Sequence, residues 1–313
     1  MADGFLLVTN ARAGGAEDDR VQAARTALAA DGPVELRPTE DAADLDRAVA
    51  DLDGRRLVAA GGDGTLHVIV NRLHAQRRLG EVPVAVIPLG TGNDLARGLG
   101  IPLDPEAAAR VAAEGDPRPL DVLVDDRGER SINAVHAGLG ARAAERSASM
   151  KSGLGPLAYP LGALIAAVGE RGWELHVTLD DEPLWSGDER VLMVGVCNAP
   201  SIGGGTLLCK GAEPDDGRLD VVVVGSVGPA ARVAFGAALR RGEHLERDDV
   251  VSARGRRVTV SGEPVRYNAD GELSDPVAQR TYRVEPRAWK VLVAPRGPQG
   301  NDPWGAVGDP GDP

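Results

Sequence analysis

Apolar and polar positions follow two different rhythms along the chain, and the change between them divides it into two regions. As far as residue 125, short apolar runs alternate with segments in which apolar residues recur every three to four positions. The runs predict strands over 5–8, 34–37, 57–60 and 82–89, and the recurring spacing predicts helices over 17–30, 39–52, 65–77 and 105–114. This alternation is typical of a parallel sheet covered by helices on both faces.

The last of these helices has distinct end signals. Asp104 is a favoured capping residue, Pro105 suits a first helical turn, and Gly115 commonly ends a helix.

Short β-rich runs dominate the chain after residue 120. They predict strands over 120–124, 130–138, 173–180, 190–199, 218–225, 256–262, 265–272, 281–285 and 289–295, with helices only near 156–170 and 229–241. We therefore expect an α/β domain with a parallel sheet over 1–125 and a mostly antiparallel β-sandwich domain over 126–295. The Gly-, Pro- and Asp-rich tail over 296–313 is expected to be disordered.

Charge and composition narrow the class of protein. The chain has 313 residues and a net charge of −12, which argues against nonspecific nucleic-acid binding because that requires a basic surface. The most apolar segment, 153–169, contains two prolines and falls short of the roughly 20 apolar residues of a membrane-spanning helix. The N-terminus lacks the basic start of a signal peptide, so we expect a cytoplasmic protein.

The two cysteines, Cys197 and Cys209, show no paired spacing of the Cys-x-x-Cys kind. We expect two free thiols in a reducing compartment, and neither a zinc site nor a disulfide.

A glycine-rich loop, Gly61-Gly62-Asp63-Gly64-Thr65, joins a predicted strand to a predicted helix. Glycines allow a ligand close to the backbone, and the amides at a helix N-terminus favour phosphate. Asp63 would repel phosphate unless a cation such as Mg²⁺ lay between them. The alternative is a plain strand-to-helix turn with a capping aspartate.

Two more loops belong at the same edge, because the carboxyl ends of parallel strands gather there. One is Gly90-Thr91-Gly92, followed by Asn93 and Asp94, and the other spans 9–15. Thr91 offers a hydroxyl, whereas Asn93 and Asp94 could simply cap the next helix. Neither a dinucleotide fingerprint nor a Walker-type P-loop occurs, so the loops are expected to face each other across a different kind of nucleotide site.

Four motifs in order give a specific resemblance. "GGDGTLHVIVNRL", "IPLGTGNDLAR", "NAPSIGGGTLLCKGAEPDDGRLDVVVV" and "NADGE" together resemble the diacylglycerol kinase catalytic-domain family, which is related to sphingosine and ceramide kinases and to NAD kinases. The resemblance covers 4–295. It implies ATP and Mg²⁺ as cofactors and transfer of a phosphoryl group to a lipid hydroxyl.

The resemblance also implies roles for individual residues. Asp63 would lie at the catalytic Mg²⁺–phosphate centre, and Glu272 would accept the proton of the lipid hydroxyl. A structural Mg²⁺ would bind the side chain of Asp216 and the carbonyl oxygens of Glu213 and Arg218, with Asp121 linking that site through water to the catalytic centre. ATP would lie between the domains and contact Asn10, Ala11, Arg12, Ala13, Gly14, Thr39, Gly61, Gly62, Asp63, Gly64, Thr65, Leu66, His67 and Thr91.

Some positions depart from the family pattern. His67 and Val68 stand where the family usually has Asn-Glu, and Arg142 stands where an acidic residue is common. Arg142, Arg146 and Lys151 could form a basic patch near a lipid entrance, or a solvated helix face.

We therefore expect an ATP-dependent kinase that phosphorylates diacylglycerol or a similar lipid at the membrane surface, as a peripherally associated enzyme. A kinase for another lipid alcohol, an NAD kinase, and a weakly active nucleotide- or lipid-binding regulator remain alternatives. The sequence leaves a homodimer open.

Overall fold

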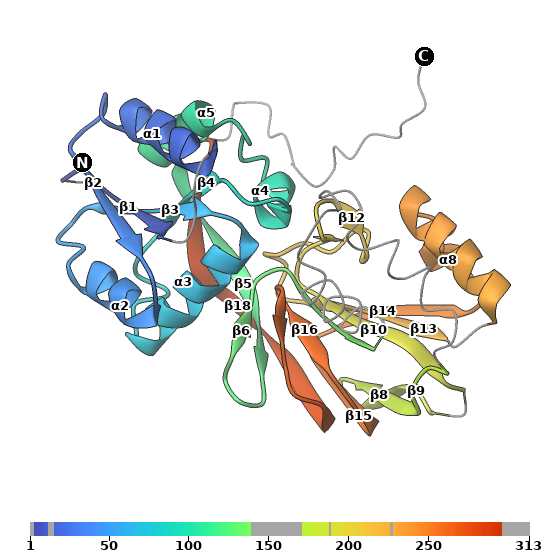
Figure 1. The fold of residues 1–313 in the computed structure, drawn as a ribbon. Helices are drawn as coiled ribbons and strands as arrows, with labels where there is room; N and C mark the ends of the chain where they lie inside the picture. The colour runs from blue at the N-terminus through green and yellow to red at the C-terminus, as the bar shows by residue number, and fades with distance from the viewer. Residues whose placement is uncertain (1–2, 12–15, 139–170, 188, 226–227, 296–313) are drawn as a thin grey trace, which may run out of the picture. The chain divides into compact units, whose positions relative to one another are not determined.

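The computed structural model describes residues 3–11, 16–138, 171–187, 189–225 and 228–295. The chain forms two compact units, drawn in Figure 1. The first unit contains residues 1–120 together with 287–313, and the second contains 121–286. The predicted boundary after residue 125 falls near this division. The prediction did not foresee that the chain returns to the first unit from Arg287 onward.

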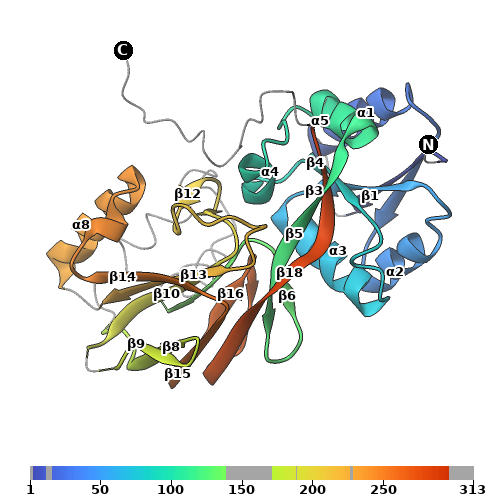
Figure 2. The same cartoon turned by 180° about the vertical axis from the view of Figure 1, so that it is seen from behind.

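The first unit is built on a parallel sheet with the strand order β2-β1-β3-β4. Its strands are β1 (Phe5–Asn10), β2 (Val34–Thr39), β3 (Arg56–Gly61) and β4 (Val84–Pro88), and the end of β18 (Val277–Val293) pairs in parallel with β4. Helices α1 (Ala16–Leu28) and α5 (Pro105–Glu114) lie on one face, and α2 (Ala42–Ala50) and α3 (Asp63–Ala75) lie on the other (Figures 1 and 2). The predicted α/β fold is confirmed.

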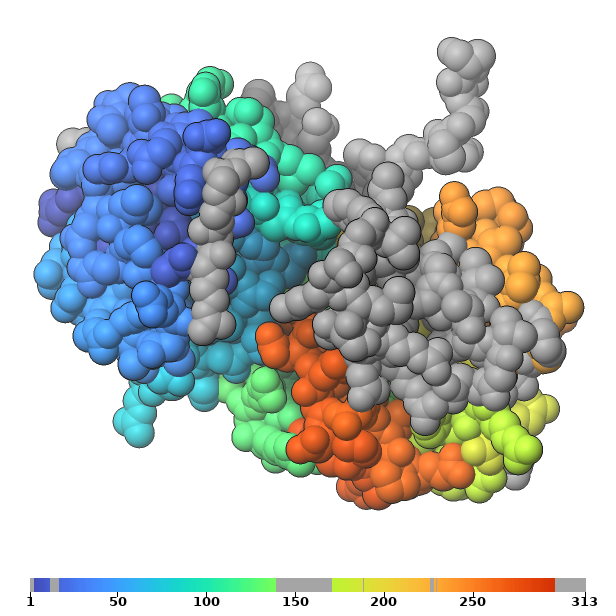
Figure 3. Space-filling model, in the orientation of Figure 1, coloured from blue at the N-terminus to red at the C-terminus, as the bar shows by residue number. Residues whose placement is uncertain are grey.

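The helices shield the central strands β1, β3 and β4, which are largely apolar and buried. The side chains of Leu6, Leu7, Leu57 and Val58 are fully buried, as expected for a parallel sheet covered on both faces. The surface of this unit is coloured mainly blue to green in Figure 3.

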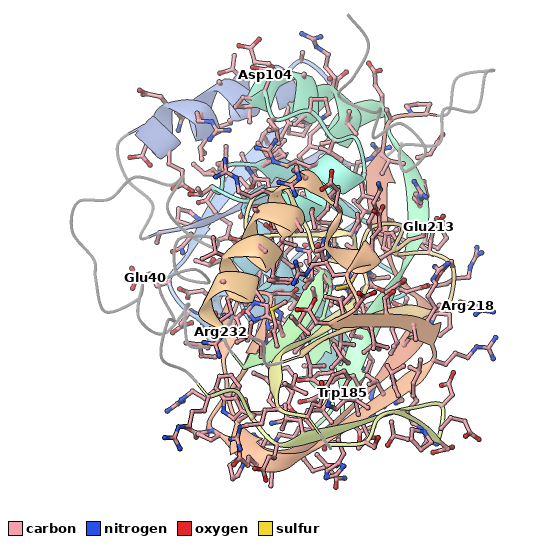
Figure 4. All side chains as sticks on the ribbon, turned by 90° about the vertical axis from the view of Figure 1, so that its right-hand side faces the viewer. Glu40, Asp104, Trp185, Glu213, Arg218 and Arg232 are labelled. Carbon is pink, nitrogen blue, oxygen red and sulfur yellow. A yellow bond between two sulfur atoms is a disulfide. The ribbon has the colours of Figure 1, made fainter. Side chains whose placement is uncertain are left out.

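The helix ends follow local chemistry. The Asp104 carboxylate accepts a hydrogen bond from the Ala107 amide at 2.9 Å, and α5 spans the predicted residues (Figure 4). Helix α3 begins at Asp63 rather than at Thr65.

The second unit is a sandwich of two antiparallel layers. One layer has the order β14-β13-β10-β7-β16-β17, and the other contains β15, β8, β9 and the first part of β18, with β5 and β6 beside them. Apolar side chains of both layers form one buried cluster, which includes Val194, Val222, Val258 and Tyr282. The predicted antiparallel β-sandwich is therefore confirmed.

The strands and helices of the second unit have the following bounds: β5 (Asp116–Asp125), β6 (Arg130–Ser131), β7 (Ala134–Gly138), β8 (Leu175–Leu179), β9 (Glu182–Trp185), β10 (Val191–Cys197), β11 (Ser201–Ile202), β12 (Thr206–Leu207), β13 (Leu219–Gly225), α8 (Pro229–Arg241), η2 (His244–Glu246), β14 (Val250–Gly255), β15 (Arg257–Val265), β16 (Tyr267–Ala269) and β17 (Glu272–Leu273). The predicted helix over 229–241 matches α8.

Other predictions fall on residues that the structure does not describe. These are the helix near 156–170, the tail over 296–313, and the side chains of Arg142, Arg146 and Lys151. Among the described residues, no helix has both the length and the apolar character needed to cross a membrane.

The cysteines correct a prediction. Cys197 and Cys209 form a disulfide and are not free thiols. They are 12 residues apart, and β10 and the loop after β12 bring their Cα atoms within 6.3 Å. Their wide sequence spacing gave no sign of this pairing, because the proximity depends on how the loop folds back.

Candidate functional site

The parallel strands of the first unit end level with one another. Asn10 pairs with Thr39, Thr9 pairs with Ala60, and Gly61 pairs with Pro88. The loops that follow β1, β3 and β4 therefore leave the sheet at a single edge. This is the edge at which ligands bind in open parallel sheets.

Three of the residues predicted to contact ATP lie together at this edge. The Ala11 amide donates to the Thr39 carbonyl at 3.0 Å, and Asn10 is the register partner of Thr39. The Thr39 hydroxyl donates to the Thr9 carbonyl at 3.0 Å, so it fastens β2 to β1. Arg12, Ala13 and Gly14 lie outside the described residues.

The two glycine loops of the first unit touch through their backbones. A Cβ atom added at Gly90 would lie 2.6 Å from the Gly62 Cα atom, a distance that side chains do not tolerate. The Leu89 amide also donates to the Gly61 carbonyl at 2.9 Å. Gly62 and Gly90 are therefore required for contact between the loops, and not only for the approach of a ligand.

Asp63 provides a second link between the loops. One carboxylate oxygen accepts from the Asp94 amide at 3.0 Å, and the other accepts from the Leu95 amide at 3.1 Å. Asp63 thus caps helix α4 (Asp94–Gly98), the role that the sequence suggested for Asn93 or Asp94. Asn93 is the cap residue by position, but its side chain makes no capping hydrogen bond, and its backbone is left-handed with φ 52°.

The N-terminus of α3 places backbone amide donors at the same edge of the sheet. The first amides of a helix have no acceptor within it, and those of α3 include Gly64 and Thr65. A Cβ atom added at Gly64 would meet no atom within 4 Å, and Thr91 is exposed, so both can meet a ligand. Leu66 and His67 have buried side chains, so Leu66 could contact ATP directly only through its backbone.

Sequence reasoning missed two residues that shape the second glycine loop. The Arg20 guanidinium donates to the carbonyls of Pro88 at 2.8 Å and of Leu103 at 3.2 Å. The Asn93 side-chain amide donates to the Gly90 carbonyl at 2.6 Å. Nothing in the sequence around Arg20 indicates that its side chain binds carbonyl groups of a distant loop. Asn93 belongs to the "GTGND" motif, but the sequence suggested only that it caps the next helix.

Glu272 is the first residue of β17, directly after the tight turn that joins β16 to β17, and it is exposed. The turn is fixed by Asp270, whose carboxylate accepts from the amides of Ile132, Asn133 and Ala134 at 2.6, 2.9 and 3.2 Å. Asp270 has a left-handed backbone, with φ 50°. The aspartate of "NADGE" therefore positions the glutamate, a role that was not predicted.

The predicted metal turn of the second unit lies against Asp121. The fully buried Asp121 carboxylate accepts from the Gly217 amide at 2.7 Å, and its amide donates to the Pro214 carbonyl at 2.6 Å. Glu213 and Arg218, labelled in Figure 4, stand at the two ends of this turn. The water-mediated role predicted for Asp121 stays a prediction.

Asp216 is held by groups of its own surroundings. One carboxylate oxygen accepts from the Arg218 amide at 2.8 Å, and the other forms an ion pair with Arg254. Arg254 also pairs with Asp220 at 3.1 Å. Burial raises the pKa of Asp220 to about 6. The positive charge of Arg254 lowers this pKa, whereas the negative charges of Asp216 and Glu213 raise it further.

This turn fits a hard cation by its donor chemistry. Carboxylate and carbonyl oxygens are the ligands that Mg²⁺ takes, and the crowded negative charge around Asp220 would be relieved by a cation. Arg254 supplies the positive charge in this structure, and the described residues hold no group of three or more acidic, His or Cys side chains arranged to bind a metal. A cation would therefore rely on Asp216, carbonyl oxygens and water.

Comparison with known proteins matches both units. Residues 4–124 match the profile of the diacylglycerol kinase catalytic domain, and residues 133–293 match that of the YegS C-terminal NAD kinase beta sandwich-like domain. A Pseudomonas aeruginosa protein named "Probable lipid kinase YegS-like" is 33% identical over 310 residues, which cover 96% of this chain and 98% of that protein. A Stenotrophomonas maltophilia protein of the same name is 32% identical over 266 residues, covering 80% of this chain and 83% of that protein.

The chain belongs to the YegS-like family. Its fold is similar to that of a solved protein, described as a diacylglycerol kinase from Bacillus anthracis. The two chains superpose with a TM-score of 0.74 at 23% identity, over 94% of this chain and 98% of the other. The two proteins therefore share a fold.

Proposed function

We propose that this YegS-like protein transfers the γ-phosphoryl group of ATP to the hydroxyl of diacylglycerol or a similar lipid alcohol. The observation that carries the proposal is the contact between the two glycine loops, which is closed by Gly62, Gly90 and the Asp63 carboxylate. Membership of a family whose relatives are named as lipid kinases supports the choice of acceptor.

The first unit would bind the triphosphate through its backbone. The amides of Gly64 and Thr65 and the positive end of the α3 dipole favour negative charge at the sheet edge. Gly64 leaves room for phosphate oxygens to approach the chain. The exposed hydroxyl of Thr91 would add a donor from the facing loop.

Phosphoryl transfer depends mainly on alignment and charge neutralisation. Mg²⁺, when bound, would offset the charge of the phosphates beside Asp63. Because both oxygens of Asp63 already accept amide hydrogen bonds, the residue would also keep the two loops in register during transfer. Its charge and its positioning role can be separated by mutation.

Glu272 would accept the proton of the lipid hydroxyl. It is an exposed carboxylate directly after a turn that Asp270 holds with three amide hydrogen bonds. A general base of this kind typically contributes about 10²–10⁴ to the rate. The second unit would thus supply the base and the first unit the nucleotide.

The test is a transfer assay with ATP radiolabelled on its γ-phosphate and mixed micelles of diacylglycerol, ceramide or sphingosine. We expect label in the diacylglycerol product, and a loss of about 10²-fold or more in kcat with Glu272→Gln. Glu182→Gln, at an exposed glutamate that begins β9, is the matched control and should retain activity. Label in none of the three lipids would reject the proposal.

Three alternatives can be distinguished with the same protein preparation. Label in ceramide or sphingosine alone would reassign the acceptor within the lipid kinases. Phosphorylation of NAD in a coupled assay would indicate an NAD kinase. Binding of ATP without transfer to any acceptor would indicate a regulator.

A further inference from the structure

The disulfide joins the end of β10 to the loop that leads into the acidic turn. Cys197 is the last residue of β10, and Cys209 lies between β12 and the turn 213–218. Both cysteines are buried. The bridge thus closes the β11–β12 hairpin loop onto the central strand of one sandwich layer.

Both cysteines lie beside Asp220, the second residue of the strand that follows the turn, and the Cys209 sulfur is 4.0 Å from the Asp220 carbonyl oxygen. Cys197 is the register partner of Asp220 on one side and of Ala134 on the other. The next residue, Asn198, donates its side-chain amide to the carbonyls of Asp121 at 3.1 Å and of Ile132 at 2.8 Å. The bridge therefore lies at the point where the turn, Asp121 and the strand of Asp220 meet.

At the Cys209 end of the loop, Leu208, Cys209 and Ala212 are buried in the core and are also held by hydrogen bonds. The amides of Leu208 and Cys209 share the Pro200 carbonyl at 3.0 and 3.2 Å, and the Ala212 amide donates to the Cys209 carbonyl at 3.0 Å. A ring nitrogen of His244 lies 2.8 Å from the Leu208 carbonyl oxygen. These contacts can keep the segment packed after the bridge opens, whereas the exposed stretches 203–205 and 210–211 can open locally.

We propose that Cys197 and Cys209 form a reversible thiol–disulfide modification site that controls the order of segment 198–218. In the reducing direction, a dithiol attacks one sulfur, forms a mixed disulfide, and then closes its own disulfide. Two electrons and two protons pass to the cysteines, which become thiols. An oxidised dithiol reverses the exchange. Closing a loop of this length is expected to suppress local opening by roughly 100-fold at most.

Lys210 offers a direct probe of this segment. It is exposed, it follows Cys209, and the chain contains only two other lysines, Lys151 and Lys290. A lysine-specific protease therefore has few cleavage sites. Lys290 lies in β18 within the first unit, so its cleavage reports on unfolding of that unit.

The experiment compares the aerobically purified full chain, the same protein reduced with dithiothreitol, and the double variant Cys197→Ser/Cys209→Ser. Alkylation and mass measurement confirm the redox state of each sample. We expect cleavage after Lys210 to be at least 10-fold faster in the reduced protein and in the double variant, with cleavage after Lys290 unchanged. Dithiothreitol should have no effect on the double variant.

Equal cleavage rates after Lys210 in the oxidised and reduced wild-type protein would overturn the proposal, and so would free thiols in the aerobically purified protein. If the double variant fails to fold, the wild-type comparison still decides. A second arm rests on the proposed function: the Mg²⁺ concentration needed for half-maximal kinase activity should rise on reduction. Because proteolysis needs no kinase activity, failure of the proposed function would leave the first arm intact.

Discussion

The substitution Gly64→Ala should change protein stability and ATP affinity in opposite directions. Gly64 lies in the first turn of α3, does not have a positive φ, and has no atom within 4 Å of its added Cβ position. Alanine is favoured over glycine in a helix by about 0.5–1 kcal/mol, so the free energy of unfolding should rise by up to this amount. The new methyl group would occupy the surface where we propose that phosphate approaches the backbone. The affinity for ATP should therefore fall by about 10-fold or more, equivalent to about 1.4 kcal/mol.

Urea unfolding and calorimetric titration with ATP measure the two effects on the same preparation. Gly228→Ala is the matched control, because Gly228 is also an open glycine at a helix N-terminus but belongs to the second unit. It should leave ATP affinity unchanged. Unchanged ATP affinity in Gly64→Ala would refute the reasoning, because the α3 amides could not then be in contact with phosphate.

The remaining predictions concern three other residues. Gly90→Ala should lower both stability, by about 1–3 kcal/mol, and ATP affinity, because its Cβ atom would lie 2.6 Å from Gly62; normal urea unfolding would contradict this. Asp63→Ala should lose about 0.5–2 kcal/mol of stability with the two amide bonds, whereas Asp63→Asn should lose less stability yet still lose transfer activity; equal stability losses would argue against the capping role. The pKa of Asp220 is about 6 in the fold, above its value of 3.8 when exposed, so the unfolded chain releases this proton first as pH rises; the resulting loss of stability grows between about pH 4 and pH 6 and stays constant above that range. Asp220→Asn should therefore be more stable than the wild type at pH 8, by about 1–2 kcal/mol after allowance for solvent screening, with the gain vanishing towards pH 4; a gain independent of pH would contradict the assignment.

The sequence predicted those helices and strands well whose ends or burial depend on neighbouring residues. The capping signals of Asp104 and Gly115 fixed α5, and continuous apolar runs identified the buried parallel strands. The common edge of the strands also followed from the sequence, because parallel strands joined by helices must end on the same side.

Features that depend on long-range contacts could not be predicted. Asp63 and Leu95 are 32 residues apart, and nothing local indicates that the carboxylate caps α4. Asp270 likewise binds amides more than 130 residues earlier in the chain. The disulfide shows the same limit, since the pairing of Cys197 and Cys209 requires the loop after β12 to return to β10.

The central claim is that the amides at the start of α3, beside the second glycine loop, bind the phosphates of ATP. Residue-resolved amide hydrogen exchange, with and without ATP and Mg²⁺, measures this directly. The account predicts that ATP slows exchange at Gly64 and Thr65 and at Thr91, with little change in α5. Exchange at Gly64 and Thr65 that stays the same under saturating ATP would contradict it.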